Sequence, residues 1–470
     1  MGNPMNRREF LEAGLSAGLL GVTGCAAARV KPAGGALSTA EGQHAQIGVT
    51  EPAKADTWFV RTTHPEAQWF AKARLGLFIH WGISSVHGGI DISWGMIKDT
   101  PWDTKGIRVT PNQYWALADR FNPDKYDPRK WLAAAKAMGC RYAVLTTRHH
   151  DGYAMWPSRY GNFSTRTHLG GRDLIRPYVE ACRAESLKVG LYFSPPDWHY
   201  ARRHMSFRYA RAEGPPLGPD HQPTKLLPST PEYIAEQQRQ VRGQVEELLT
   251  NYGRIDVMWF DGSFPGAREV IPVEWVRKLQ PQIVINPRLW SVGDFETPEC
   301  KMPQQRPAGW WETCQIWQNG GWGYSSREQY RPTAWVLDLL ARTATWGGNL
   351  LINISPRPDG SLPDSLYAKM AEGAAWMKTH GQAIFDADPG PYPEQCSHPV
   401  TVDGKKWYVF VPPEYTGAVT LKNVSRPASA TLMGNGQSVA MAFADDDTLT
   451  ILPATPHRDK HMGVVVVQWS

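Results

Sequence analysis

Short apolar runs that alternate with amphipathic, helix-like stretches constrain the fold of this chain more than any other feature. The helix-like stretches include PRKWLAAAKAMG (128–139) and EYIAEQQRQVRGQVEELLTNYG (232–253). Near-continuous apolar strands that alternate with helices are typical of a parallel sheet buried on both faces. The apolar runs are LGLFIH (75–80), YAVLTT (142–147), KVGLYFS (188–194), IDVMWF (255–260), IVIN (283–286) and LLINI (350–354), with ETCQIW (312–317) as a weaker candidate.

The length of this alternation predicts an α/β fold, a (β/α)8-like TIM-type barrel over residues 56–387. A doubly wound open sheet is the alternative, but no GxGxxG follows any of the runs. After residue 387 the pattern changes to short alternating strands separated by turn residues, as in VDGKKWYVFVP (402–412). This second pattern predicts a small antiparallel β-sandwich domain over 388–470.

The N-terminus has the features of an export signal. The twin arginines Arg7 and Arg8 precede an apolar region, 15–22, that is too short to span a bilayer. VTGC (22–25) resembles a lipobox, whose cysteine is lipidated; a plain signal peptide is the alternative. We expect an export signal over 1–25 and a flexible tether over 26–55.

These features predict an exported bacterial protein that is periplasmic, or a lipoprotein of the outer membrane or cell surface. Its membrane contact would then be a lipid anchor at Cys25. The net charge of +5 is spread along the chain without basic runs, which argues against nucleic-acid binding. The six cysteines form no CxxC pair, and no metal or cofactor is expected. The 21 tryptophans suit apolar surfaces with polar edges, sugar faces among them.

Polar side chains stand where several of the predicted strands end, which is where barrel enzymes place their catalytic groups. Three histidines with one aspartate could ligate a metal ion, whereas two carboxylates among His, Arg and Trp are typical of glycoside hydrolysis. Adjacent histidines rarely converge on one metal ion, which favours glycoside hydrolysis over a metal site. The strand-end residues are His80, His149, His150, Asp151, Tyr192, Ser194, Asp261, Asn286 and Arg288.

A set of motifs, in order from about residue 66 to 385, resembles glycoside hydrolase family 29, the α-L-fucosidases. The resemblance implies a retaining exo-glycosidase that releases terminal α-L-fucose, or a closely related L-sugar, from fucosylated glycans through a covalent glycosyl-aspartate. The motifs are FIHWG (78–82), RHHDGYAMWPS (148–158), GLYFS (190–194), MWFDG (258–262), GDFETPE (293–299), WETC (311–314), WGY (322–324), GGNLLINISPRPDG (347–360) and HGQAIF (380–385).

The resemblance also implies roles for single residues. Asp261 is the expected nucleophile and Glu299 the expected acid/base, with Glu312 as the alternative. The apolar pocket for the C5 methyl group of fucose is expected from Phe78, Trp259 and Trp322. The residues expected to hold the sugar hydroxyls are His80, Trp94, His149, His150, Tyr192 and Arg288.

One position departs from the family pattern. In ISWGM (92–96), Ser93 stands where the family carries an acidic residue before the tryptophan, and Asp91 lies two residues away. Either Asp91 substitutes for that acid or the sugar specificity differs. Because of this departure, one alternative is that the protein binds carbohydrate without hydrolysing it. Because of the histidines, another alternative is a metal-dependent barrel hydrolase.

Overall fold

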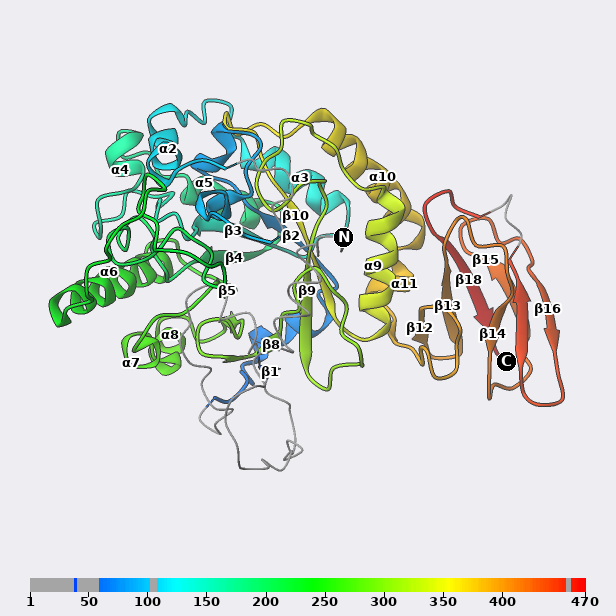
Figure 1. Cartoon of the computed structure of the whole chain (residues 1–470). Coiled ribbons are helices and arrows are strands. Elements are labelled where there is room, and N and C mark those ends of the chain that lie inside the picture. The colour runs from blue at the N-terminus through cyan, green and yellow to red at the C-terminus, as the bar shows by residue number, and fades with distance from the viewer. Residues whose placement is uncertain (1–37, 40–58, 102–107, 454–457) are drawn as a thin grey trace.

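The first domain is a parallel barrel. The computed structural model describes residues 38–39, 59–101, 108–453 and 458–470. Eight strands form one sheet in the order β6-β5-β4-β3-β2-β10-β9-β8 with parallel pairing throughout (Figure 1), which confirms the predicted barrel. The strands are β2 (Leu75–Ile79), β3 (Tyr142–Arg148), β4 (Lys188–Phe193), β5 (Val257–Phe260), β6 (Val284–Ile285), β8 (Phe295–Glu296), β9 (Trp310–Ile316) and β10 (Asn349–Ile354).

Asp294 connects the two edge strands, β6 and β8. Its backbone N–H donates to the Ile285 carbonyl at 2.8 Å, and its carboxylate accepts the Ile285 N–H at 2.8 Å. The same carboxylate accepts from the Thr62 N–H and from Arg277. Burial raises the pKa of Asp294 to about 6, although Arg277 and these N–H donors oppose the rise. Asp294 therefore stabilises the barrel closure and does not line the mouth.

Helices cover the outside of the barrel. Two of the longer ones, α3 and α6, begin with a proline at the first helical position, where a missing N–H costs nothing. In α6 the Thr230 hydroxyl also accepts the Tyr233 N–H at 3.2 Å as an N-cap. The helices are α2 (Pro111–Trp115), α3 (Pro128–Ala137), α4 (Thr165–His168), α5 (Ile175–Ala184), α6 (Pro231–Thr250), α7 (Ala267–Val270), α8 (Val273–Leu279), α9 (Thr333–Thr345), α10 (Asp364–His380) and α11 (Gln382–Phe385), with short 3-10 helices η3 (Pro65–Lys72), η4 (Ile83–Val86), η5 (Ile92–Met96) and η6 (Ala116–Arg120).

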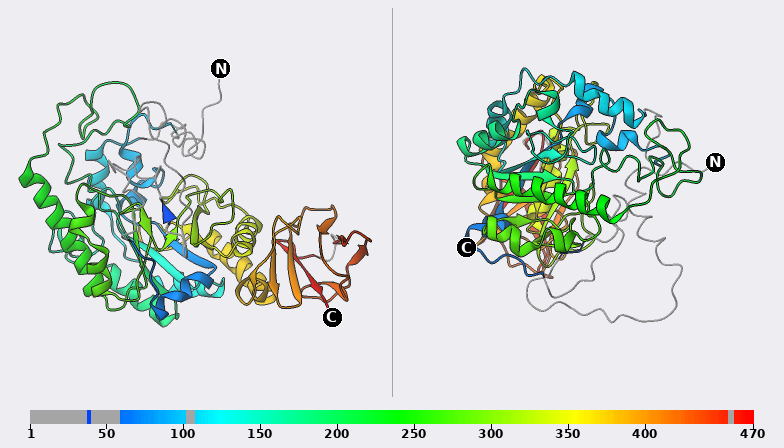
Figure 2. Two further views of the ribbon diagram at one scale, coloured as in Figure 1. Left: turned by 90° about the horizontal axis from the view of Figure 1, so that it is seen from below. Right: turned by 90° about the vertical axis from the view of Figure 1, so that its left-hand side faces the viewer.

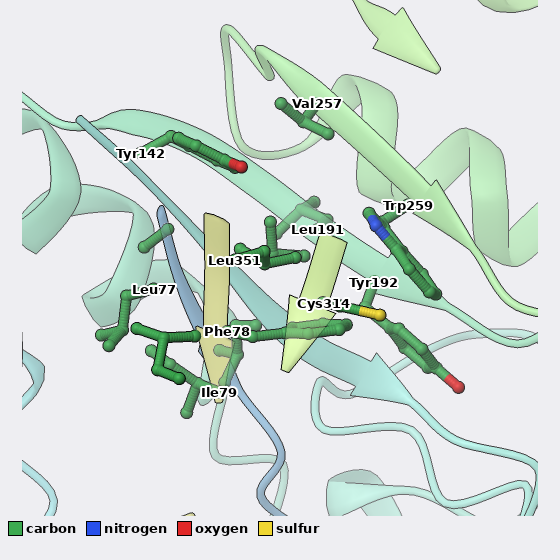
Figure 3. Close-up of a cluster of buried hydrophobic side chains, with 14 of the residues drawn as sticks. Leu77, Phe78, Ile79, Tyr142, Leu191, Tyr192, Val257, Trp259, Cys314 and Leu351 are labelled. Carbon is green, nitrogen blue, oxygen red and sulfur yellow. The ribbon is translucent and has the colours of Figure 1, made fainter. Parts of the chain in front are cut away.

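The barrel interior is filled with side chains from neighbouring strands. Strands β2 and β3 are buried along their whole length. Figure 3 shows Phe78, Tyr192 and Trp259, from three different strands, packed in one cluster. A Cβ at Gly76 would lie 2.3 Å from the Tyr142 ring, so only glycine fits beneath it. This filled interior leaves the strand ends as the place for chemistry.

The second domain is an antiparallel β-sandwich beside α9–α11, as Figure 2 shows. The Trp376 indole donates to the Met462 carbonyl at 2.7 Å, and Thr401 donates to the Ala383 carbonyl at 2.6 Å, which joins it to the barrel. One sheet has the order β11-β12-β13-β18-β15 and the other β14-β17-β16. The strands are β11 (Asp388–Pro389), β12 (Val400–Asp403), β13 (Lys406–Val411), β14 (Val419–Leu421), β15 (Ser429–Leu432), β16 (Ala440–Phe443), β17 (Leu449–Leu452) and β18 (Gly463–Gln468).

The predicted export signal (1–25), with its Cys25, lies outside the described residues. So does the predicted tether (26–55), apart from β1 (Ser38–Thr39), which pairs antiparallel with β7 (Val292–Gly293). Within the described part of the chain, every helix is too short or too polar to cross a membrane.

Candidate active site

A bulge at the end of β3 turns both neighbouring histidines toward the barrel mouth. The parallel register of β3 against β4 shifts between Thr146 and Arg148. The two rings that follow lie 4.2 Å apart and are both buried. In a regular strand, neighbouring side chains point to opposite faces. The shift therefore explains how His149 and His150 contribute to one site.

Hydrogen bonds fix the orientation of both rings. His150 Nδ1 lies 2.5 Å from the Ser194 hydroxyl, which in turn donates to the Pro196 carbonyl. His149 stacks on the Tyr192 ring with an interplanar angle of 3°. Burial lowers the pKa of His150 to about 4, so this ring is neutral at pH 7. A neutral, oriented imidazole suits hydrogen bonding to a sugar hydroxyl.

Ser93 contacts His149 and the backbone of Asp151, and it does not face the mouth of the barrel. It is fully buried, its hydroxyl lies 2.6 Å from His149 Nδ1, and it accepts the Asp151 N–H at 2.9 Å. Asp151 itself accepts from the Tyr114 hydroxyl and the Tyr153 N–H. Asp151 therefore caps the turn after the histidines. The Nδ1 atom of His149 has the Ser93 hydroxyl as its hydrogen-bond partner.

Asp261 follows β5 directly and accepts hydrogen bonds on both of its carboxylate oxygens. Tyr192 donates its hydroxyl to Oδ2 at 2.6 Å, and Arg288 donates to Oδ1 at 2.9 Å. His150 Nε2 lies 3.5 Å from Oδ2. Burial alone would raise the pKa of Asp261, but the charge of Arg288 and the hydrogen bonds from Tyr192 and Arg288 outweigh it and hold the pKa below its ordinary value. The carboxylate is therefore ionised and available as a nucleophile.

Arg288 brings Glu299 next to Asp261. Its Nη2 donates to Glu299 Oε2 at 2.9 Å, while its Nη1 donates to Asp261. The two carboxylates are thus separated by no more than two hydrogen bonds and one guanidinium group. This arrangement is compatible with the spacing of about 5–5.5 Å that a retaining glycosidase needs.

Trp322 holds the other oxygen of Glu299. Its indole donates to Glu299 Oε1 at 3.1 Å. Its own backbone N–H donates to Asp91 Oδ1 at 2.7 Å. Asp91 therefore contacts the segment that carries Trp322 and acts on the site through it.

Glu312, the alternative acid/base, lies deeper in the barrel. It pairs with Asn349, the first residue of β10, and is fully buried. It accepts hydrogen bonds from the Tyr142 hydroxyl and, at 3.0 Å, from the Trp259 indole. Burial raises its pKa to about 7, although these hydrogen bonds oppose the rise. The geometry favours Glu299, because Glu299 and not Glu312 shares Arg288 with Asp261.

Aromatic rings form one wall of the mouth. Phe78 lies 5.1 Å from Trp259 and 5.8 Å from Trp322, measured between ring centroids. His80 packs against Phe78 at 4.4 Å and against Trp322 at 4.9 Å. Trp94, from η5, completes the far side and meets the His150 ring at 6.0 Å. The structure thus brings together the predicted sugar-binding residues, whose individual roles stay predictions.

The side chains of one group are close enough together to ligate a metal ion, if distance is the only criterion. Ligand atoms of His149, His150 and Asp261 all lie within 4.8 Å of one another. However, both oxygens of Asp261 already accept hydrogen bonds, one of them from a guanidinium cation. A second cation at this carboxylate would be repelled by Arg288. The donor set therefore fits sugar hydroxyls better than a divalent cation.

The sequence did not indicate two of the supporting residues. Asn353 Oδ1 lies 2.7 Å from His80 Nδ1, and its amide nitrogen donates to the Trp322 carbonyl. Ser93, which stands where the family carries an acid, contacts His149, which the sequence did not indicate. A polar asparagine inside the apolar run LLINI was the available signal for the first residue. The contact between Ser93 and His149 depends on how η5 packs, and no local sequence pattern indicates it.

Known proteins resemble this chain over most of its length. The family model for alpha-L-fucosidase matches residues 43–382. Mouse tissue alpha-L-fucosidase is 23% identical over 88% of this chain and 93% of its own length, and the Branchiostoma floridae alpha-L-fucosidase is 26% identical over 72% and 76%.

Solved structures share the fold. Alpha-L-fucosidase isoenzyme 1 from Paenibacillus thiaminolyticus superposes with a TM-score of 0.72 at 29% identity and covers 86% of this chain and 99% of its own. A GH29 alpha-L-fucosidase from Bacteroides thetaiotaomicron, solved as a trapped covalent intermediate, superposes with a TM-score of 0.71 at 23% identity over 89% and 98%. The family match covers more than half of the chain, and this chain therefore belongs to the alpha-L-fucosidase family.

Proposed function

We propose that this protein is a retaining α-L-fucosidase that removes terminal α-L-fucose from glycans, with Asp261 as nucleophile and Glu299 as acid/base. The observation that carries the proposal is the pair of carboxylates joined by Arg288 at the barrel mouth. One of them, Asp261, has a lowered pKa and is ionised. A nucleophile and a proton donor on opposite sides of one glycosidic bond are the two parts that this reaction needs.

In the first step, an oxygen of Asp261 attacks the anomeric carbon while the bond from that carbon to the leaving-group oxygen breaks. Glu299 donates its proton to this oxygen, so the aglycone leaves as a neutral alcohol. In the second step, Glu299 takes a proton from water, and the resulting hydroxide attacks the anomeric carbon. The bond to Asp261 breaks, and fucose is released with its original configuration.

The neighbouring rings support an L-fucose glycone. Phe78, Trp259 and Trp322 present apolar faces on one side of the mouth. The histidines His80, His149 and His150 offer ring nitrogens beside these faces. Such an apolar wall favours a C5 methyl group over a hydroxymethyl group by about a hundredfold at most. A panel of aryl glycosides of L-fucose, L-galactose, D-galactose and D-arabinose measures this preference.

Chemical rescue tests the two carboxylates directly. Asp261→Gly is expected to lose turnover on the order of 10⁴-fold or more, because the covalent step has no nucleophile. Azide should restore activity by filling the cavity, and the product should be the β-fucosyl azide. Glu299→Gly with azide should give the α-fucosyl azide, since azide then replaces water in the second step. Full activity of Asp261→Gly without azide would contradict the proposal.

We also propose that the protein is exported by the twin-arginine route and anchored through a lipid at Cys25. Support comes from Arg7 and Arg8 and from the lipobox-like VTGC (22–25). Labelled palmitate should be incorporated into the wild-type protein and not into Cys25→Ser. The combined variant Arg7→Lys and Arg8→Lys should remain in the cytoplasm. An exported protein that carries no lipid would contradict the anchor and leave the export proposal standing.

A further inference from the structure

The Ser194 hydroxyl, directly after β4, lies between the His150 ring and a backbone carbonyl. Its Oγ is 2.5 Å from His150 Nδ1, and it donates to the Pro196 carbonyl at 2.9 Å. A carbonyl oxygen can only accept a hydrogen bond, so the single hydroxyl proton lies on the bond to Pro196. The short contact between Oγ and Nδ1 must then use a proton of the ring. Nδ1 therefore carries the proton of the His150 imidazole.

The other ring nitrogen of His150, Nε2, is consequently an acceptor. Burial lowers the pKa of His150 to about 4, so the ring holds a single proton at pH 7. Nε2 is buried, and no group among the described residues forms a hydrogen bond with it. It lies 3.5 Å from Asp261 Oδ2, which is longer than the roughly 2.7–3.2 Å of an N–H···O hydrogen bond. Two lone pairs therefore face each other across this gap.

The carboxylate of Asp261 by itself favours the opposite tautomer. An imidazole beside an ionised carboxylate gains by pointing an N–H at it, because a charge-assisted hydrogen bond is stronger than a neutral one. Oδ2 already accepts the Tyr192 hydroxyl at 2.6 Å. A second donor on Oδ2 would occupy electrons that the nucleophile needs for attack. The contact with Ser194 keeps this donor away from Asp261.

The adjacent histidine, His149, is not constrained in this way. Its Nδ1 also lies beside a serine hydroxyl, that of Ser93, at 2.6 Å. Ser93, however, accepts the Asp151 N–H at 2.9 Å, so its own proton is available for the ring. This contact is compatible with either tautomer of His149. Of the two neighbouring rings, His150 is the one whose proton is placed by its serine.

We propose that Ser194 is a positioning residue, which holds the proton of His150 on Nδ1 and so presents Nε2 as an acceptor for a hydroxyl group of the bound sugar. The proposal rests on the glycosidase function proposed above and adds a requirement to it, namely that this hydroxyl donates. A hydroxyl that enters the gap gives its proton to the ring and leaves Asp261 Oδ2 available. Ser194 is fully buried and acts through His150.

NMR spectroscopy of ¹⁵N-labelled histidine measures the tautomer in the free wild-type protein at pH 7, with His150→Gln to assign the signals. The expected result is a protonated Nδ1 and an unprotonated Nε2. In Ser194→Ala the proton should move to Nε2, because Asp261 is then the better acceptor. Ser194→Thr keeps the hydroxyl and should keep the wild-type tautomer. An unprotonated Nδ1 in the wild type would overturn the proposal without the need for any variant of Ser194.

Kinetics give a second measurement. Ser194→Ala should raise the KM for an aryl α-L-fucoside about tenfold, the equivalent of one lost neutral hydrogen bond. It should also lower kcat, because the new N–H binds Asp261. Thr401→Val in β12 removes another buried hydroxyl that donates to a backbone carbonyl, and it should change neither KM nor the tautomer.

Two further outcomes separate this proposal from the proposed function. An unchanged tautomer and KM in Ser194→Ala, with only the melting temperature lowered, would overturn the positioning role and leave the fucosidase standing. If the wild type has the expected tautomer but hydrolyses no α-L-fucoside, the proposed function fails. The role of Ser194 in sugar binding is then overturned with it, although the tautomer assignment is correct.

Discussion

Arg288 Nη1 and Asp261 Oδ1 are joined by a hydrogen bond of 2.9 Å between two buried, charged groups. Burial disfavours charge on both partners, yet the pKa of Asp261 is lowered. Although burial opposes it, the pKa of Arg288 is raised by the charges of Glu299 and Asp261. The ionised form of each side chain is therefore stabilised by the charge of the other.

This dependence gives a pH prediction for Arg288→Met. Without the guanidinium, burial raises the pKa of Asp261, so the acidic limb of kcat/KM should move to higher pH. At neutral pH, kcat/KM on an aryl α-L-fucoside should fall by about 10²–10³-fold, as for loss of other charge-stabilising donors. Arg288→Lys keeps the charge and should shift the limb less. An acidic limb that stays in place in Arg288→Met, with a circular dichroism spectrum like that of the wild type, would contradict this coupling.

Leaving-group dependence separates the two candidate acids. Glu299→Gln should lower kcat/KM by about 10²–10⁴-fold on fucosides with poor leaving groups. The loss should be much smaller for a dinitrophenyl fucoside, because that leaving group departs without a proton. Glu312→Gln should keep the dependence of the wild type, since Glu312 is buried against Tyr142 and Trp259. The reverse result would assign the acid/base to Glu312.

The barrel could be predicted because its strands are buried on both faces and therefore read as continuous apolar runs. The run at 312–317, the weakest of the set, overlaps β9 (Trp310–Ile316). Strand β8 (Phe295–Glu296) could not be predicted, since Phe295 stands between Asp294 and Glu296 and not in an apolar run. The residues of the mouth could be predicted from the same logic, because parallel strand ends converge.

The supporting contacts could not be predicted, because they join distant parts of the chain. Ser93 and His149 are 56 positions apart, and His80 and Asn353 are 273 positions apart. Neither spacing follows from a helical or strand period. Such contacts are determined by how a loop packs against a strand end. Comparison with the family pattern identified Ser93 as unusual but could not show that it faces away from the mouth.

Glu312 gives a prediction for stability. Its pKa is raised to about 7 in the folded protein, against 4.5 as the ordinary value. The folded state then binds more protons than the unfolded state, so this stabilising contribution is complete below about pH 4.5 and is lost as pH rises through 7. Glu312→Gln has no carboxyl group at this position, so its stability should not show this loss as the pH rises. Its melting temperature relative to the wild type should therefore increase between pH 5 and 8, and a constant difference would contradict the assignment.

Ser93 gives a prediction for sugar binding. Ser93→Ala leaves the buried Asp151 N–H without its acceptor, which costs about 1–3 kcal/mol of stability, and removes the hydroxyl beside His149 Nδ1. If Ser93 orients His149, the KM for an aryl L-fucoside should rise about tenfold, the equivalent of one lost neutral hydrogen bond. Ser84→Ala, which removes another buried hydroxyl from neighbouring η4, should lower the melting temperature without raising KM. An unchanged KM in Ser93→Ala, with only the melting temperature lowered, would restrict Ser93 to a structural role.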